Sequence, residues 1–171
     1  MSSIVRAISP EVSEPPAGTW SNCLVVGGIA YLAGMTARGI DQNNMAGDEY
    51  AQAKAIFGKI RHLVEAAGGS MADIVKVTIF VTDITQREKI WQARREFFTG
   101  NFPASTSVQV AALAGPSLKV EIEAVAHIGA SKRSSSLAVA WPQPGHEFLY
   151  GSAGSQPGPV EPPGCSIRRL P

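Results

Sequence analysis

The chain has 171 residues, of which 44% are apolar, and its 15 basic and 14 acidic residues leave a formal net charge of +1. This length suits one domain with a substantial core rather than two. The near-neutral charge, with no Lys/Arg run longer than a dipeptide, disfavours a nucleic-acid partner, because a phosphate backbone is bound mainly through clustered cations.

Membrane insertion and secretion are also disfavoured by the sequence. No apolar run approaches the roughly eighteen residues that a membrane-spanning helix needs, and residues 1–10 lack the basic start and apolar core of a secretory signal. We therefore expect a cytoplasmic protein with no membrane partner.

Short β-strands are predicted near the start of the chain. One is expected within 3–8, and two apolar runs, 24–26 and 29–33, flank Gly27-Gly28. Two apolar runs separated by a pair of glycines are typical of a β-hairpin, because the tight turn requires residues that accept positive φ.

Two helices are predicted further along. The first follows Asp48, a suitable N-cap, and ends at Gly68, because apolar residues recur between them at helical spacing. The second is expected to begin at the capping-box pattern of 85–88, and its apolar stripe places Trp91 and Phe97 in the core.

Three more strands complete the predicted sheet. The β-branched run 74–81 lies between the helices, and 106–113 and 118–128 are expected to form a second hairpin through 114–117. Two helices and a majority of strands favour an α+β fold, a mixed β-sheet with both helices on one face. Because several strands also carry apolar residues on the other face, we expect a second copy of the chain to cover it.

The composition changes near the end of the chain. Seven of the twelve prolines fall in 131–171, together with several glycines and serines. Such a mixture buries too little apolar area to offset the entropy of ordering. We therefore predict a folded domain over 1–129 and a Pro/Gly/Ser-rich C-terminal tail over 130–171 that is disordered or loosely docked.

Metal and disulfide chemistry find little support. Cys23 and Cys165 make no disulfide framework, and His62, His127 and His146 have no partners at ligand spacing. The sequence thus predicts neither a metal nor a cofactor, and it places Cys23 in the core.

Four motifs in order resemble those of the Rid family, the reactive intermediate deaminases also called YjgF-type or RidA-like proteins. They are YLAGM at 31–35, VKVTIFVTD at 75–83, NFPA at 101–104 and VEIEAVA at 120–126. The resemblance implies a chorismate-mutase-like fold and a homotrimer with small-molecule sites in the clefts between subunits. It also implies a hydrolase that converts imines and enamines into 2-keto acids and ammonia.

The resemblance assigns roles to particular residues. Glu121 matches the glutamate that orients the attacking water, a role that suits a carboxylate able to accept the water's proton. Trp20 falls where many members have a tyrosine, and Gly34 and Ser107 are further candidate substrate-binding residues. Ser105 stands where the family usually has an arginine that grips the substrate carboxylate with two charge-assisted hydrogen bonds.

The change at Ser105 leaves the function open. A single hydroxyl in place of a guanidinium is expected to weaken carboxylate binding by about ten- to a hundred-fold. Arg38 is a candidate replacement cation, and 105–107 could instead form a neutral polar wall. The competing interpretation is that Glu121 and Arg38 are solvated surface residues with no functional role.

Two functions from different classes follow. One is hydrolysis of a reactive imine, enamine or related metabolite in an inter-subunit cleft, with Glu121 and a water. The alternative is a non-catalytic Rid homologue that acts as a metabolite-binding or protein-interaction module. Ribonuclease activity, which the resemblance also raises, is disfavoured by the near-neutral charge.

Overall fold

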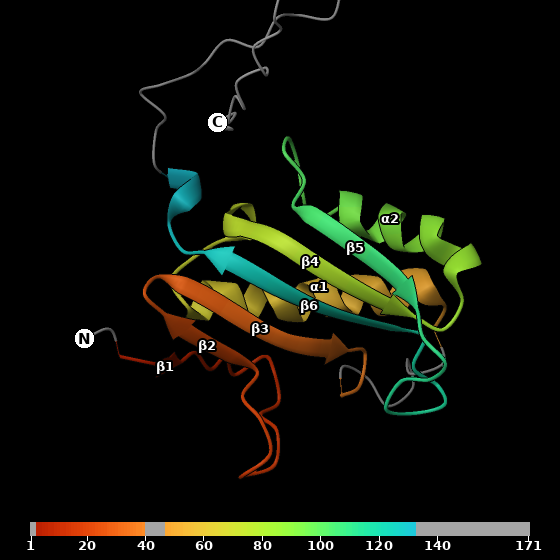
Figure 1. The fold of residues 1–171 in the computed structure, drawn as a ribbon, viewed down its shortest axis with the longest axis horizontal. Helices are drawn as coiled ribbons and strands as arrows, with labels where there is room; N and C mark the ends of the chain where they lie inside the picture. Colours follow the sequence, from red (N-terminus) through yellow and green to blue (C-terminus); the bar gives the residue numbers. More distant parts are fainter. Residues whose placement is uncertain (1–2, 40–46, 133–171) are drawn as a thin grey trace, which may run out of the picture. The chain divides into compact units, whose positions relative to one another are not determined.

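The computed structural model describes residues 3–39 and 47–132, which form one six-stranded sheet with two α-helices (Figure 1). The strands are β1 (Val5–Arg6), β2 (Cys23–Val26), β3 (Ile29–Thr36), β4 (Ile74–Val81), β5 (Ala104–Gln109) and β6 (Val120–His127). The helices are α1 (Glu49–Ala66) and α2 (Arg87–Arg95), with short 3-10 turns at η1 (Met71–Asp73), η2 (Ile84–Gln86) and η3 (Ala130–Lys132).

The predicted hairpin between β2 and β3 is present. Val26 pairs with Ile29 across the turn, and Gly27 and Gly28 have φ values of 57° and 80°. Positive φ at both central residues is the geometry that a two-residue turn needs to match the twist of its strands. β1 spans only Val5–Arg6, so the strand expected within 3–8 is shorter than its apolar residues indicated.

The second predicted hairpin is wrong. The strand order is β1-β2-β3-β6-β4-β5, so β6 lies between β3 and β4, antiparallel to both, and β4 separates it from β5. β5 instead pairs with β4 in parallel. Because α2 connects β4 to β5 and returns the chain in its original direction, these two strands pair in parallel, and β4 then lies between β5 and β6.

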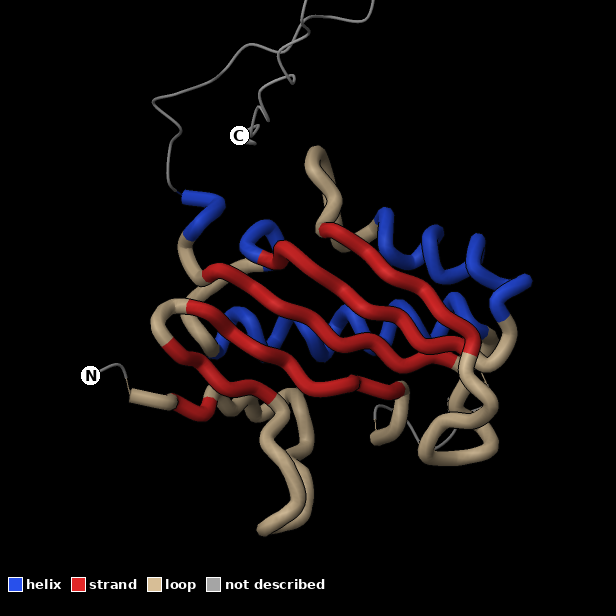
Figure 2. The backbone as a smooth tube through the Cα atoms, in the orientation of Figure 1, coloured by secondary structure: helices blue, strands red, loops and turns tan. Residues whose placement is uncertain are grey.

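Both helices cover one face of the sheet, as predicted, and Figure 2 shows them on the far side of the strands. The fully buried residues of α1 include Ile56, Phe57 and Ile60. The ring of Phe57 lies 5.6 Å from that of Phe97 and 5.7 Å from that of Phe98, which joins α1 to the segment after α2. The apolar side of β6 is buried as its alternation predicts: Val120, Ile122, Ala124 and Ala126 are at most 2% exposed.

The start of α1 follows its predicted cap, but the start of α2 does not. Asp48 accepts a hydrogen bond from the backbone N–H of Ala51 at 3.0 Å. Before α2, Asp83 accepts from Thr85 N at 2.9 Å and begins the 3-10 turn η2, and Gln86 makes no side-chain cap. The capping box over 85–88 is therefore not formed, because Asp83 reaches the free backbone N–H groups two residues earlier.

Trp91 is not a core residue, contrary to the prediction. Its side chain is 39% exposed, and the Arg87 guanidinium lies over its ring at 5.8 Å from the centroid. The buried face of α2 runs through Ile90 and Ala93, so Trp91 is displaced to the margin of the helix–sheet contact. Phe97 packs against the core, as expected.

A buried carboxylate joins the turn after α1 to the segment after β6. Asp73, only 1% exposed, accepts hydrogen bonds from Ser70 N at 2.9 Å and from Ser131 N at 2.8 Å. Burial alone would raise the pKa of Asp73, but the hydrogen bonds from Ser131, Gly129 and Ser70 outweigh it and lower that pKa. The predicted tail beyond Lys132 lies outside the described residues, so a domain boundary at 129/130 stays a prediction.

Replacing Asp73 by Ala should lower the free energy of unfolding at pH 7 by about 1–3 kcal/mol, because buried donors lose their partner. The pKa of Asp73 is lower in the folded than in the unfolded protein. The ionised carboxylate therefore stabilises the fold fully above the unfolded pKa of about 3.9, and this stabilisation is lost as pH falls through the folded pKa. Urea unfolding of the wild type and Asp73→Ala should therefore converge below about pH 4. Exposed Glu65→Ala is the control, and a stability gap that persists undiminished at low pH would contradict the assignment.

Candidate functional site

Glu121 lies on the face of the sheet opposite the helices, where β6 meets β3. Its neighbours across the sheet are Thr36 on β3 and Phe80 on β4. The pairing of β3 with β6 shifts register between Leu32 and Met35, which includes Gly34 in an irregular stretch. A Cβ atom at Gly34 would lie 2.1 Å from Oε1 of Glu121, so only glycine permits the carboxylate to approach the β3 backbone this closely.

The surroundings of Glu121 alter its acidity. Burial raises the pKa of the Glu121 carboxyl, and the like charge of Glu123 on the same strand raises it further. A raised pKa makes a carboxylate a better proton acceptor, which is what a general base needs. Glu123 itself is exposed, so the two acidic residues of β6 differ in environment although they share one face.

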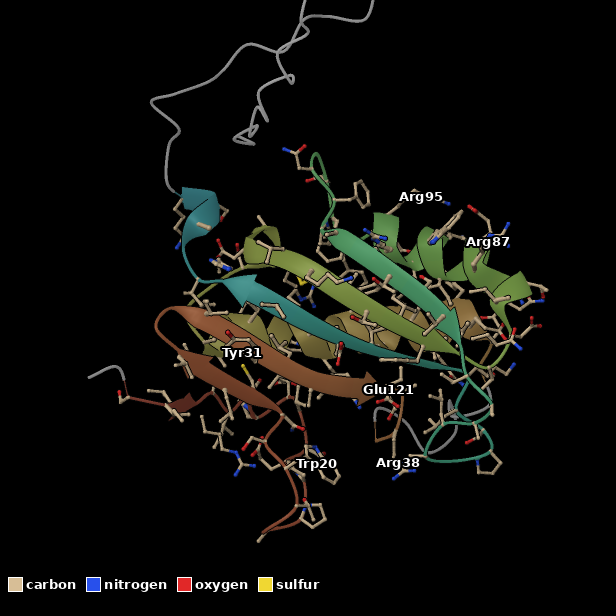
Figure 3. All side chains as sticks on the ribbon, viewed as in Figure 1. Trp20, Tyr31, Arg38, Arg87, Arg95 and Glu121 are labelled. Carbon is tan, nitrogen blue, oxygen red and sulfur yellow. The ribbon has the colours of Figure 1, made fainter. Side chains whose placement is uncertain are left out.

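Three of the predicted site residues line a single pocket. Trp20, Gly34 and Arg38 border a cavity of about 360 Å³, which reaches the β3 backbone at Gly34 and Thr36 beside Glu121. Figure 3 shows Trp20, Arg38 and Glu121 gathered toward one end of the sheet. Trp20, Gly34 and Arg38 are thus brought together, whereas Glu121 does not line the cavity and adjoins it through Gly34 and Thr36.

A second cation in this pocket was not predicted. Lys59 of α1 lines the cavity, and its ammonium donates hydrogen bonds to the backbone oxygens of Thr36, at 2.8 Å, and Arg38. Burial lowers the pKa of Lys59, and the charge of Arg38 lowers it further. The available sequence signal was weak: Lys59 flanks the apolar stripe of α1, where a lysine is usually only solvated.

The guanidinium of Arg38 contacts the loop that precedes β6. Its Nη2 donates to the carbonyl of Ala114 at 3.0 Å. The end of this loop is fixed from α1, since the buried amide of Gln52 donates to Ser117 O at 2.9 Å and accepts from Lys119 N at 2.8 Å. These contacts set the chain entering β6 and hence the position of Glu121.

The acid that lines the pocket is already paired. Glu14 forms an ion pair with Arg6 at 2.5 Å and accepts a hydrogen bond from Asn22 Nδ2 at 3.2 Å. Its charge is therefore largely balanced from outside the cavity. The positive charges of Arg38 and Lys59 consequently dominate the pocket.

Ser105 and Ser107 do not join this pocket within one chain. On β5 they lie opposite Val77 and Ile79 of β4, whose side chains are buried on the helix face. Glu121 lies opposite Phe80, on the other face. Successive strand residues alternate between faces, so the two serines leave the sheet on the side opposite Glu121.

The neutral polar wall suggested for 105–107 is not formed as a continuous surface. Thr106 lies between the two serines and points to the face of Glu121, where it accepts a hydrogen bond from Lys76. Both serines remain exposed. The turn before them is held by Arg94 of α2, which donates to Pro103 O at 2.8 Å and stacks over the Phe102 ring at 5.3 Å from its centroid.

Within residues 3–39 and 47–132, no three His, Cys, Asp or Glu side chains are grouped so as to hold a metal ion. Neither α-helix of this described part combines the length and apolar character required to cross a membrane.

Known proteins share this fold and these motifs. The family model described as Endoribonuclease L-PSP matches residues 11–128. A 2-iminobutanoate/2-iminopropanoate deaminase from Dermatophagoides farinae is 35% identical over 121 residues, which cover 70% of this chain and 94% of the relative.

Solved structures agree with that match. A Pseudomonas aeruginosa protein of unknown function is 39% identical with a TM-score of 0.70, over 75% of this chain and 94% of its own. RidA from an Antarctic Psychrobacter is 30% identical with a TM-score of 0.65, over 72% and 100% of the two chains. The YjgF gene product of E. coli is 30% identical with a TM-score of 0.64, over 72% of this chain and 98% of its own.

The fold defines the YjgF-like class of α+β proteins, a mixed six-stranded sheet backed by two helices. The chain belongs to the Rid family. Both the recognition from sequence motifs and the predicted Rid-type fold are therefore confirmed.

Replacing Gly34 by Ala should displace the Glu121 carboxylate toward solvent, because the new methyl group would occupy its position. The pKa of Glu121, measured by carbon-detected NMR of its carboxyl group, should then fall toward the ordinary glutamate value. Gly58→Ala, within α1 where a Cβ meets no atom within 4 Å, is the matched control. A Glu121 pKa unchanged in Gly34→Ala would contradict the proposed contact.

Proposed function

We propose that the protein hydrolyses small imines or enamines in a cleft between subunits, with Glu121 holding the attacking water. The observation that carries this proposal is the Glu121 carboxylate, half-buried against the Gly34 backbone beside a pocket of about 360 Å³. The name of the Dermatophagoides farinae relative, a 2-iminobutanoate/2-iminopropanoate deaminase, supports the reaction class.

The chemistry requires one water and one proton acceptor. Glu121 takes a proton from the water as its oxygen bonds to the carbon of the protonated imine, which gives a carbinolamine. The proton is then passed to the nitrogen, and as the carbon–nitrogen bond breaks the hydroxyl gives its proton to Glu121, so that ammonia leaves and a ketone remains. An enamine enters the same sequence after protonation at carbon gives the protonated imine. The raised pKa of Glu121 suits both steps, because the group must accept a proton and return it.

The position of β5 supports a site shared between subunits. Ser105 and Ser107 leave the sheet on the face opposite Glu121, so they can line the same cleft only if they come from another copy of the chain. The face of Glu121 also exposes apolar side chains, including Tyr31 at 50% and Val108 at 40%. A homotrimer would cover this face and complete the cleft, in agreement with the assembly that the family resemblance implies.

Ser105 supports the alternative function. Without the usual arginine, β5 supplies no positive charge at this position, so a metabolite-binding module that lacks hydrolysis is the second candidate. The two candidates share the pocket and differ in whether Glu121 performs chemistry. The cytoplasmic location inferred from the sequence stays a prediction.

An imine generated in situ by an amino-acid oxidase provides the test of hydrolysis. Glu121→Gln should lower the rate of ammonia release by about a hundred-fold or more, because the general base is lost. Glu123→Gln, a change of the same kind on the same strand, should have little effect. Ser105→Arg should raise the rate on substrates that carry a carboxylate. Ammonia release at background for both wild type and Ser105→Arg would exclude the hydrolase.

Mixing two inactive variants tests the shared cleft. Ser107→Trp should block the β5 side of the site and Glu121→Gln the other side, and each variant alone should be inactive. In an equal mixture, each half of a shared site comes from an intact strand in about half of the cases. Both halves are then intact in about a quarter of the sites, so co-assembled chains should recover about a quarter of wild-type activity. Light scattering should give the mass of a trimer. A monomer, or no recovery on mixing, would refute the shared cleft.

A further inference from the structure

Arg38 and Lys59 place two positive charges in the pocket beside Glu121. Among residues 3–39 and 47–132, neither side chain forms an ion pair with a carboxylate. Their partners are backbone carbonyls: Ala114 O for Arg38, and Thr36 O and Arg38 O for Lys59. Carbonyl dipoles orient these groups but leave their net charge unbalanced, which favours an anion in the pocket.

Both cations retain hydrogen-bonding capacity. An ammonium has three donors, and two backbone oxygens accept from that of Lys59. The guanidinium of Arg38 donates through Nη2 to one carbonyl, and its planar group carries further N–H donors. Lys59 also fixes the segment that bears Arg38, because it binds the Arg38 backbone oxygen.

The pocket has room for a small acid. Its volume of about 360 Å³ lies near the lower end of small-molecule sites, and Trp20, which is 57% exposed, forms one wall. Thr36 and Gly34 connect this wall to Glu121, since Thr36 pairs with Glu121 and Gly34 contacts its carboxylate. Glu121 does not itself line the cavity, so a molecule anchored here by a negative group would adjoin the proposed base at the Gly34 backbone.

We propose that Arg38 and Lys59 form a carboxylate-binding subsite on the Glu121 side of the cleft, which performs the anchoring that Ser105 cannot. The ligand class is a small 2-imino acid, or its 2-keto acid product, with its side chain against Trp20. The identification of the imino acid as substrate rests on the proposed function, whereas binding of the keto acid does not.

The subsite is tested by binding rather than by turnover. Isothermal titration of the full chain with 2-oxobutanoate should show binding that weakens with added salt, because an ion-pair contribution is screened. Arg38→Met and Lys59→Met should each weaken it by about ten-fold or more. Lys54→Met is the matched control on α1, since Lys54 is exposed and pairs with Glu96 at 2.8 Å. Butanone, which lacks the carboxylate, should not compete.

Additional variants distinguish a loss of binding at the subsite from a loss of folding or of catalysis. Lys59→Met leaves two carbonyls without a partner, so its thermal unfolding is recorded, and the exposed Arg38 carries the test if that variant unfolds. Equal affinity of wild type and Arg38→Met would overturn the proposal. Glu121→Gln should still bind 2-oxobutanoate. If the wild type does not hydrolyse imines but binds 2-oxobutanoate in an Arg38-dependent manner, the proposed hydrolase activity is refuted and the proposed subsite is not.

One acidic residue close in sequence requires its own control. Asp41 falls in 40–46, outside the described residues. Asp41→Asn should leave the affinity for 2-oxobutanoate within about two-fold of wild type, because the proposed subsite consists of Arg38 and Lys59 and includes no internal anion. An increase of about ten-fold or more would identify Asp41 as the internal anion of the pocket and overturn the proposal.

Discussion

The insertion of β6 between β3 and β4 is the constraint on which the candidate site depends. It gives β6 hydrogen-bonded neighbours on both sides, and its apolar residues are buried under the helices. With that face fixed, the alternation of the strand directs Glu121 to the other side. The irregular pairing at Gly34 then admits the carboxylate against the β3 backbone, where burial raises its pKa. A one-residue slip of β6 would remove all of these properties together.

Charge is distributed unevenly around this carboxylate. Arg38 and Lys59 lie on the side of the pocket near α1, held by backbone carbonyls, while Glu14 is paired with Arg6. On β5, the usual arginine position carries Ser105. The positive charge of the pocket thus comes from Arg38, after β3, and from Lys59 of α1 rather than from β5. If the proposed subsite is correct, Glu121 remains the base, and the substrate carboxylate is held by Arg38 and Lys59 instead of by a residue of β5.

Local sequence patterns allowed much of the fold to be predicted. Contacts between segments far apart in the sequence could not be predicted from such patterns. Gly27-Gly28 and the cap at Asp48 act through their own backbone, so their hairpin and helix follow from a few residues. The place of β6 could not be deduced in this way, because the loop before it, 110–119, is compatible with either neighbour. Lys59 was missed for a related reason: its role depends on Thr36 and Arg38, whose distance from α1 is set by tertiary packing.

The separation of Ser105 and Glu121 onto opposite faces has a consequence for catalysis. Within a single chain Glu121 leaves the sheet on one face and Ser105 and Ser107 on the other, and no side-chain motion within the sheet exchanges the two faces. Under the proposed assembly, a neighbouring copy covers the exposed Tyr31 and Val108 and also excludes water from around Glu121. Lower water content would strengthen the attraction between the pocket's cations and a bound carboxylate. Burial of the apolar face and strengthening of the site would then result from the same association.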